Sequence, residues 1–163
     1  MTKKSELAVK LFTPLINQKV RTIQKGHGSF LTIGFGADIL IHHTEEARTR
    51  PEWLLWVYMC FWSIMKATKI LADSDDEREI IEEALKEIEG KKLLNVEVLS
   101  KTYDMKLAFE DGIVLSLFSN NAEDDNVQWR LFTPDSQVLV AGPNEELSYH
   151  SAQLKEESNN ENS

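Results

Sequence analysis

The sequence predicts an α+β fold. It consists of two related antiparallel β-rich units, packed together or joined as one sheet or barrel, with an amphipathic helix over residues 75–89 between them. Short apolar segments, rich in β-branched and aromatic residues, alternate with turn sequences along most of the chain. One segment instead repeats its apolar residues at helical spacing. The β-rich segments on either side of that helix follow a similar order, which indicates an internal duplication.

The length of 163 residues and the hydrophobic fraction of 42% predict one domain with a buried core. We place this domain at residues 1–143, with repeat units at 20–72 and 93–143. Residues 144–163 are rich in Glu, Asn and Ser and hold too little apolar surface to order, so they predict a flexible tail.

The first unit is preceded by a short helix, predicted over residues 2–12 and ended by Pro14. Its expected inward-facing residues are Leu7, Val9 and Leu11. The strand-type pattern begins at Val20. Strands are expected at 30–35 and 39–41, and Gly36-Ala37-Asp38 between them predicts a turn.

Residues 53–65 form the most apolar segment, and both of its alternating sets of residues are apolar. This pattern predicts a deeply buried element and does not distinguish a strand from a helix. The aromatic enrichment favours a strand, bulged or broken. The segment is shorter than the roughly 20 residues that cross a bilayer, so no membrane span is predicted.

The helix at residues 75–89 has signals at both ends. Ser74 is the expected N-cap, with Glu77 completing a capping box, and Gly90 provides the stop. The residues that fall on its apolar face are Ile80, Ile81, Ala84, Leu85 and Ile88.

The second unit is predicted as antiparallel strands joined by short turns. Asp111-Gly112 predicts a hairpin, because this pair favours positive φ. Residues 133–136 predict another turn. The expected strands are 93–99, 105–109, 113–118, 127–132 and 137–140.

The duplication is inferred by comparing residues 30–65 with 105–140. Each segment is interpreted as strand, turn, strand, polar loop, and a strand that begins near a Trp. The equivalent pairs are Phe35 with Phe109 and Trp53 with Trp129.

Several motifs together resemble a family of small uncharacterised bacterial proteins. The resemblance covers residues 20–143. Its motifs are Gly26-His27-Gly28-Ser29-Phe30, Cys60-Phe61-Trp62-Ser63-Ile64, Ile70-Leu71-Ala72-Asp73-Ser74, Phe109-Glu110-Asp111-Gly112 and Trp129-Arg130-Leu131. The family has no assigned chemistry, so the resemblance implies a fold and a bacterial type of origin but no site.

The net charge of −9 is unevenly distributed: residues 1–72 carry +5, residues 73–135 carry −10 and residues 145–163 carry −4. An acidic chain without a basic stripe is a poor nucleic-acid binder, so no nucleic-acid partner is expected. Acidic bias suits a basic protein partner, although it also serves solubility alone. The single cysteine and the absence of an apolar leader predict a cytoplasmic protein.

Two groups of residues are candidate sites. Asp111 with Glu123, Asp124 and Asp125 is a candidate acidic protein-binding patch, and a solvated loop is the alternative interpretation. His27 and Ser29 form a candidate ligand-binding or hydrolytic pair, and a simple hairpin turn is the alternative.

No catalytic residue, metal site or cofactor is assigned. His42-His43 with Glu45 and Glu46 lacks metal-ligand spacing. The acidic residues at 73–77 are explained by the first turn of a helix. Cys60 lies among large apolar residues, which predicts a buried, unreactive thiol.

The sequence therefore favours a non-enzymatic protein-interaction module, such as an inhibitor or immunity-type antagonist of a basic partner. One alternative is a small-molecule-binding or hydrolytic domain with its site near His27 and Ser29. Another is a homo-oligomeric structural module, since the sequence leaves the oligomeric state open.

Overall fold

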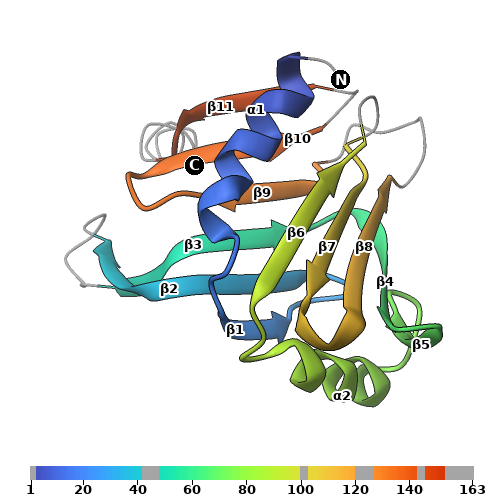
Figure 1. The fold of residues 1–163 in the computed structure, drawn as a ribbon. Coiled ribbons are helices and arrows are strands. Elements are labelled where there is room, and N and C mark those ends of the chain that lie inside the picture. The colour runs from blue at the N-terminus through green and yellow to red at the C-terminus, as the bar shows by residue number, and fades with distance from the viewer. Residues whose placement is uncertain (1–2, 42–47, 100–102, 120–126, 143–145, 153–163) are drawn as a thin grey trace.

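The computed structural model describes residues 3–41, 48–99, 103–119, 127–142 and 146–152, which form two antiparallel sheets (Figure 1). Sheet 1 has the strand order β1-β2-β3-β9-β10-β11. Its strands are β1 (Val20–Lys25), β2 (Leu31–Ile41), β3 (Arg48–Val57), β9 (Trp129–Phe132), β10 (Gln137–Ala141) and β11 (Leu147–Ser151).

Sheet 2 has the strand order β5-β4-β8-β7-β6. Its strands are β5 (Lys69–Asp73), β4 (Cys60–Lys66), β8 (Ile113–Ser119), β7 (Met105–Phe109) and β6 (Leu93–Val98). The helices are α1 (Lys3–Phe12), α2 (Arg78–Ile88) and the 3₁₀ turns η1 (Thr13–Leu15) and η2 (Glu110–Gly112). The two-sheet arrangement with two helices confirms the predicted α+β class. The described strands do not close into a barrel.

The core lies between the two sheets and α1, which crosses sheet 1 on the side that sheet 2 also covers (Figure 1). Phe12 of α1 is fully buried and meets the Trp129 ring edge to face at 5.6 Å. The Trp129 indole also donates a hydrogen bond to the Tyr103 carbonyl at 3.0 Å. Such aromatic contacts join layers that come from distant parts of the sequence.

The predicted strand at residues 53–65, bulged or broken, is confirmed: it is broken into β3 and β4, which belong to different sheets. Tyr58 and Met59 form the corner, and their amides donate to the carbonyls of Gln128 and Val127 at 2.8 and 3.1 Å. Strands that turn a corner from one sheet to the next are a known solution for packing two sheets. This crossing explains why no single apolar face could be recognised in the segment.

The predicted turn at Gly36-Ala37-Asp38 is wrong, because β2 continues from Leu31 to Ile41 through a bulge. The pairing with β3 shifts register between Phe35 and Asp38, and Gly36 adopts a φ of 81°. Glycine with positive φ is as typical of a bulge as of a turn. The Glu52 carboxylate accepts the Ala37 amide at 3.2 Å and so binds a donor that the bulge frees.

The bulge also bears on the predicted duplication. Residues 105–119 form a hairpin, β7 to β8, whereas residues 31–41, predicted to be its equivalent, form one strand. The first predicted unit, 20–72, contributes β1–β3 to sheet 1 and β4–β5 to sheet 2. Each sheet is therefore assembled from strands of both halves of the chain. The structure does not show two repeat units.

Helix α2 confirms the predicted amphipathic helix, but it begins at Arg78 with Glu77 as N-cap, so the Ser74 cap is wrong. The Ser74 hydroxyl instead accepts the Trp62 amide at 3.2 Å. Ile81, Ala84, Leu85 and Ile88 are buried as predicted, whereas Ile80 is 45% exposed.

The predicted Asp-Gly hairpin is confirmed: η2 joins β7 to β8, with φ of 64° at Asp111 and 72° at Gly112. The predicted tail from residue 144 is wrong for Leu147–Ser151, which pair with β10 as β11. A sheet edge supplies backbone partners that the composition of a segment does not reveal. Residues 153–163 lie outside the described residues.

The N-terminal helix is confirmed as α1, but its buried residues are Ser5, Ala8 and Phe12. The predicted residues Leu7, Val9 and Leu11 are only partly buried, because the helix turns Phe12 toward Trp129. In the described ranges, neither helix has the length and apolar character needed to cross a membrane.

Candidate functional site

Asp111, the one described member of the predicted acidic patch, lies at the tip of the β7–β8 hairpin and is already paired. Its carboxylate accepts a hydrogen bond from the Lys91 ammonium at 2.5 Å; Asp111 is exposed and Lys91 is partly exposed. The hydrogen bond and charge of Lys91 lower the pKa of Asp111, and Asp111 in turn raises the pKa of Lys91. Glu123, Asp124 and Asp125 lie outside the described residues. The structure therefore does not test whether they form a patch with Asp111.

His27 and Ser29 lie in the tight turn between β1 and β2. The His27 carbonyl accepts the Phe30 amide at 3.1 Å, and the Ser29 carbonyl accepts the Trp62 indole N–H at 2.7 Å. His27 is exposed, and the two side chains form no hydrogen bond with each other. This turn of sheet 1 therefore contacts sheet 2 through the Trp62 hydrogen bond. His27 and Ser29 do not form the hydrogen-bonded pair of base and nucleophile that hydrolysis requires.

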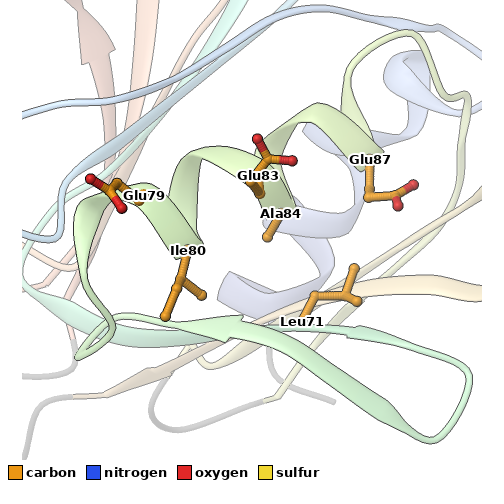
Figure 2. Close-up of a pocket in the computed structure, with 6 residues that line it drawn as sticks. All are labelled: Leu71, Glu79, Ile80, Glu83, Ala84 and Glu87. Carbon is orange, nitrogen blue, oxygen red and sulfur yellow. The ribbon is translucent and has the colours of Figure 1, made fainter.

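A groove between α2 and β5 has the shape and charge of a binding surface, and we call it the acidic groove. Its volume is about 390 Å³. It is lined by Leu71, Glu79, Ile80, Glu83, Ala84 and Glu87. Figure 2 shows Ile80 and Ala84 pointing toward the strand that carries Leu71, with the three carboxylates spaced along the helix. Four-residue spacing places these glutamates on one side of α2, about 6 Å apart along its axis.

The position of α2 follows from its buried face. Ile81, Ala84, Leu85 and Ile88 pack into the core, and the helix contacts β1 and β5. This orientation leaves Ile80 at the margin of the buried face, beside β5. Leu71 of β5, on the other side of the groove, is partly exposed. The groove therefore combines an apolar floor with a rim of negative charge.

Two of the three rim carboxylates have lysine neighbours. Glu83 pairs with Lys86 at 3.0 Å and Glu87 pairs with Lys66 at 3.7 Å, and all four side chains are well exposed. Exposed pairs of this kind contribute about 0–1 kcal/mol, so a partner's cations can replace the lysines at little cost. Glu79 has no ion pair with any described residue.

The predicted residue Asp111 belongs to the same end of the molecule as Glu87. Lys66, the partner of Glu87, also lowers the pKa of Asp111, and Glu87 contributes to the raised pKa of Lys91. Sequence reasoning thus found one acidic residue near the groove and missed the groove itself. The available signal was the four-residue spacing of Glu79, Glu83 and Glu87 beside an apolar residue at the edge of the helical face.

Cys60 is 4% exposed, and burial raises its pKa to about 12, with the charge of Asp104 adding to the shift. The thiol lies 3.5 Å from the Gln128 carbonyl. Its predicted burial is confirmed. Within the described ranges, no three or more His, Cys, Asp or Glu side chains are grouped so that they could hold a metal ion. His42, His43, Glu45 and Glu46 fall outside those ranges.

No protein-family model, curated protein or solved structure matches this chain. The resemblance to a family of small bacterial proteins therefore stays a prediction.

Proposed function

We propose that this protein is an interaction module that binds a basic protein partner through the acidic groove. The observation that carries the proposal is the alignment of Glu79, Glu83 and Glu87 beside the apolar surface of Leu71 and Ile80. Apolar contact provides affinity, and complementary charge provides orientation and a fast association rate. Covering a basic surface of the partner is how an inhibitor or immunity-type antagonist acts.

The partner expected for this groove presents lysines or arginines beside an apolar ridge. The net charge of −10 over residues 73–135 attracts such a partner at a distance. The apolar floor makes the groove different from a simple acidic surface, because Ile80 is exposed and Leu71 is partly exposed to water.

The test is a pull-down from a bacterial lysate with the wild-type chain and with the triple variant Glu79→Gln, Glu83→Gln, Glu87→Gln. We expect the wild-type chain to retain a basic protein whose binding weakens as salt rises from about 50 to 300 mM, since screening shortens the range of surface charges. The affinity of the purified partner, measured by titration calorimetry, should fall at least about tenfold in the triple variant, which corresponds to about 1.4 kcal/mol.

A matched control makes the same change in charge away from the groove. Glu6, Glu89 and Glu97 are exposed and do not line it, so Gln at these three positions should leave the affinity within about twofold. Equal loss of affinity in both variants would show that net charge alone is responsible. An Ile80→Ser variant should also weaken binding, and an unchanged affinity there would contradict a role for the apolar floor.

A further inference from the structure

Sheet 1 has a second apolar face, opposite to the one that α1 and sheet 2 cover. Trp56 and Leu54 of β3 lie beside Arg130 and Phe132 of β9 on this outer face, because the strands pair in register. Tyr58 and Phe30 extend it at one end of the strands. We call these six residues the aromatic face. All six are partly exposed, and none of them belongs to the core cluster of the described residues.

The rings of the aromatic face support one another. Phe30 stacks on Tyr58 with centroids 4.4 Å apart, Trp56 lies nearly parallel to Tyr58 at 6.3 Å, and Phe132 meets Trp56 edge to face at 5.2 Å. Contacts of this kind hold large side chains in place before binding, which lowers the entropy that a partner must overcome.

Arg130 gives this face its charge. Its guanidinium lies 5.7 Å from the centre of the Tyr58 ring, and it forms no ion pair or hydrogen bond with a described residue. The Trp56 indole N–H, on the paired strand, is buried and lacks an acceptor among the described residues. The two acidic residues within the strands of sheet 1 are engaged elsewhere: Asp38 pairs with Arg21 at 3.0 Å, and Glu52 accepts the Ala37 amide.

The aromatic face therefore presents ring surface and one guanidinium charge that has no carboxylate partner among the described residues. A second copy meeting it face to face would bring another arginine and no free carboxylate, and a buried unpaired charge is costly. The planar guanidinium of an arginine stacked on an aromatic ring can donate two parallel hydrogen bonds to a carboxylate. Trp, Tyr and Arg are also the residues that most often dominate the energy of protein interfaces.

We infer that the aromatic face is a second docking surface, which binds a protein segment carrying a carboxylate flanked by apolar side chains. This site is separate from the acidic groove, and its charge preference is the opposite. The protein would then join a basic surface and an acidic, apolar segment at two different places.

The test uses a library of random 12-residue peptides displayed on phage and selected on the immobilised full-length chain. We expect selected peptides to carry Asp or Glu next to aromatic or aliphatic residues. Their affinity, measured by fluorescence anisotropy, should fall at least tenfold in Arg130→Met, which keeps the aliphatic stem and removes the charge. Trp56→Phe, which removes part of the ring surface together with the buried N–H, should weaken binding by a smaller factor.

Controls separate this site from the groove and from loss of folding. Lys106→Met makes the same change in charge on an exposed residue of sheet 2 and should leave affinity unchanged. The Glu79, Glu83, Glu87 triple variant should bind the peptides as the wild type does, whether or not the groove has its proposed function. Selection of peptides without acidic residues, failure to select any, or equal binding to well-folded Arg130→Met would overturn the inference. Self-association that strengthens in Arg130→Met would assign the face to a second copy instead.

Discussion

Cys60 begins β4, where the sheet corner encloses its thiol. Burial raises its pKa to about 12 from an ordinary value of 9.0, and the thiolate is therefore strongly disfavoured in the folded protein. Below pH 9 the thiol is protonated in both the folded and the unfolded chain. Above pH 9 the unfolded chain releases this proton first, so the contribution of Cys60 to stability falls as pH rises toward 12.

This linkage can be isolated with Cys60→Ala, which has no thiol to titrate. The difference in free energy of unfolding between the wild type and the variant should shift by about 1.4 kcal/mol against the wild type from pH 8 to pH 10. Urea unfolding at each pH measures it. If the two stability profiles stay parallel over this interval, the thiol is not buried as described.

For the other predicted site residues, the structure shows whether the side chain or only the backbone of the residue forms a hydrogen bond. His27 and Ser29 contribute their carbonyl oxygens to the structure, and Asp111 contributes a carboxylate to Lys91. The sequence indicates which groups are present. It does not indicate which residue is their hydrogen-bond partner, because Trp62 lies 33 residues from Ser29 and Lys91 lies 20 residues from Asp111 in the sequence.

At the scale of elements, the last residue of α1, Phe12, is the largest of the three buried residues that pack this helix against the core. Phe12→Ala should destabilise the protein by about 3–5 kcal/mol, because it removes a fully buried ring and its contact with Trp129. Thermal or urea unfolding measures this change. Leu11→Ala is the control on the same helix: Leu11 is only partly buried, so the loss should be clearly smaller, and equal losses would contradict the described packing.

Elements with strong local chemistry could be predicted from the sequence. The Asp111-Gly112 hairpin and the body of α2 follow from preferences for φ and from helical spacing, which need no distant partner. Strands β5 and β11 could not be predicted, because a short polar or mixed segment becomes a strand when a neighbouring strand offers it hydrogen bonds. The bulge in β2 was mistaken for a turn for the same reason.

At the scale of the whole molecule, the two halves are interleaved. Sheet 1 takes β1–β3 from residues 20–57 and β9–β11 from residues 129–151, and sheet 2 is also assembled from both halves. The inner residues of β3, Leu55 and Val57, pair directly with Leu131 and Trp129. Neither half therefore holds a complete core.

This arrangement predicts that the fragments 1–74 and 93–152 do not fold separately. Each should show no cooperative thermal transition by circular dichroism, whereas the full chain should show one. Mixing the two fragments tests the interleaving further, since recovery of structure on mixing is expected only if each supplies strands to the other. Cooperative unfolding of either fragment alone would instead favour the duplication that the structure does not show.

The acidic groove and the aromatic face also belong to this scale. The spacing of Glu79, Glu83 and Glu87 is visible in the sequence, but the exposure of Ile80 depends on where β5 lies against α2. Trp56 and Arg130 are 74 residues apart and become neighbours only because β3 pairs with β9. Neither surface could be predicted from local pattern.

The sequence by itself determined the α+β class, the amphipathic helix, the Asp-Gly hairpin, most strand segments and the burial of Cys60. These depend on backbone preferences and on apolar spacing within a few residues of each position. The tertiary structure decided which sheet each strand joins, where the 53–65 segment breaks, and which apolar and charged side chains meet at the surface. The physical reason is that strand pairing is made between segments distant in the chain, and a single sequence carries no direct record of that pairing.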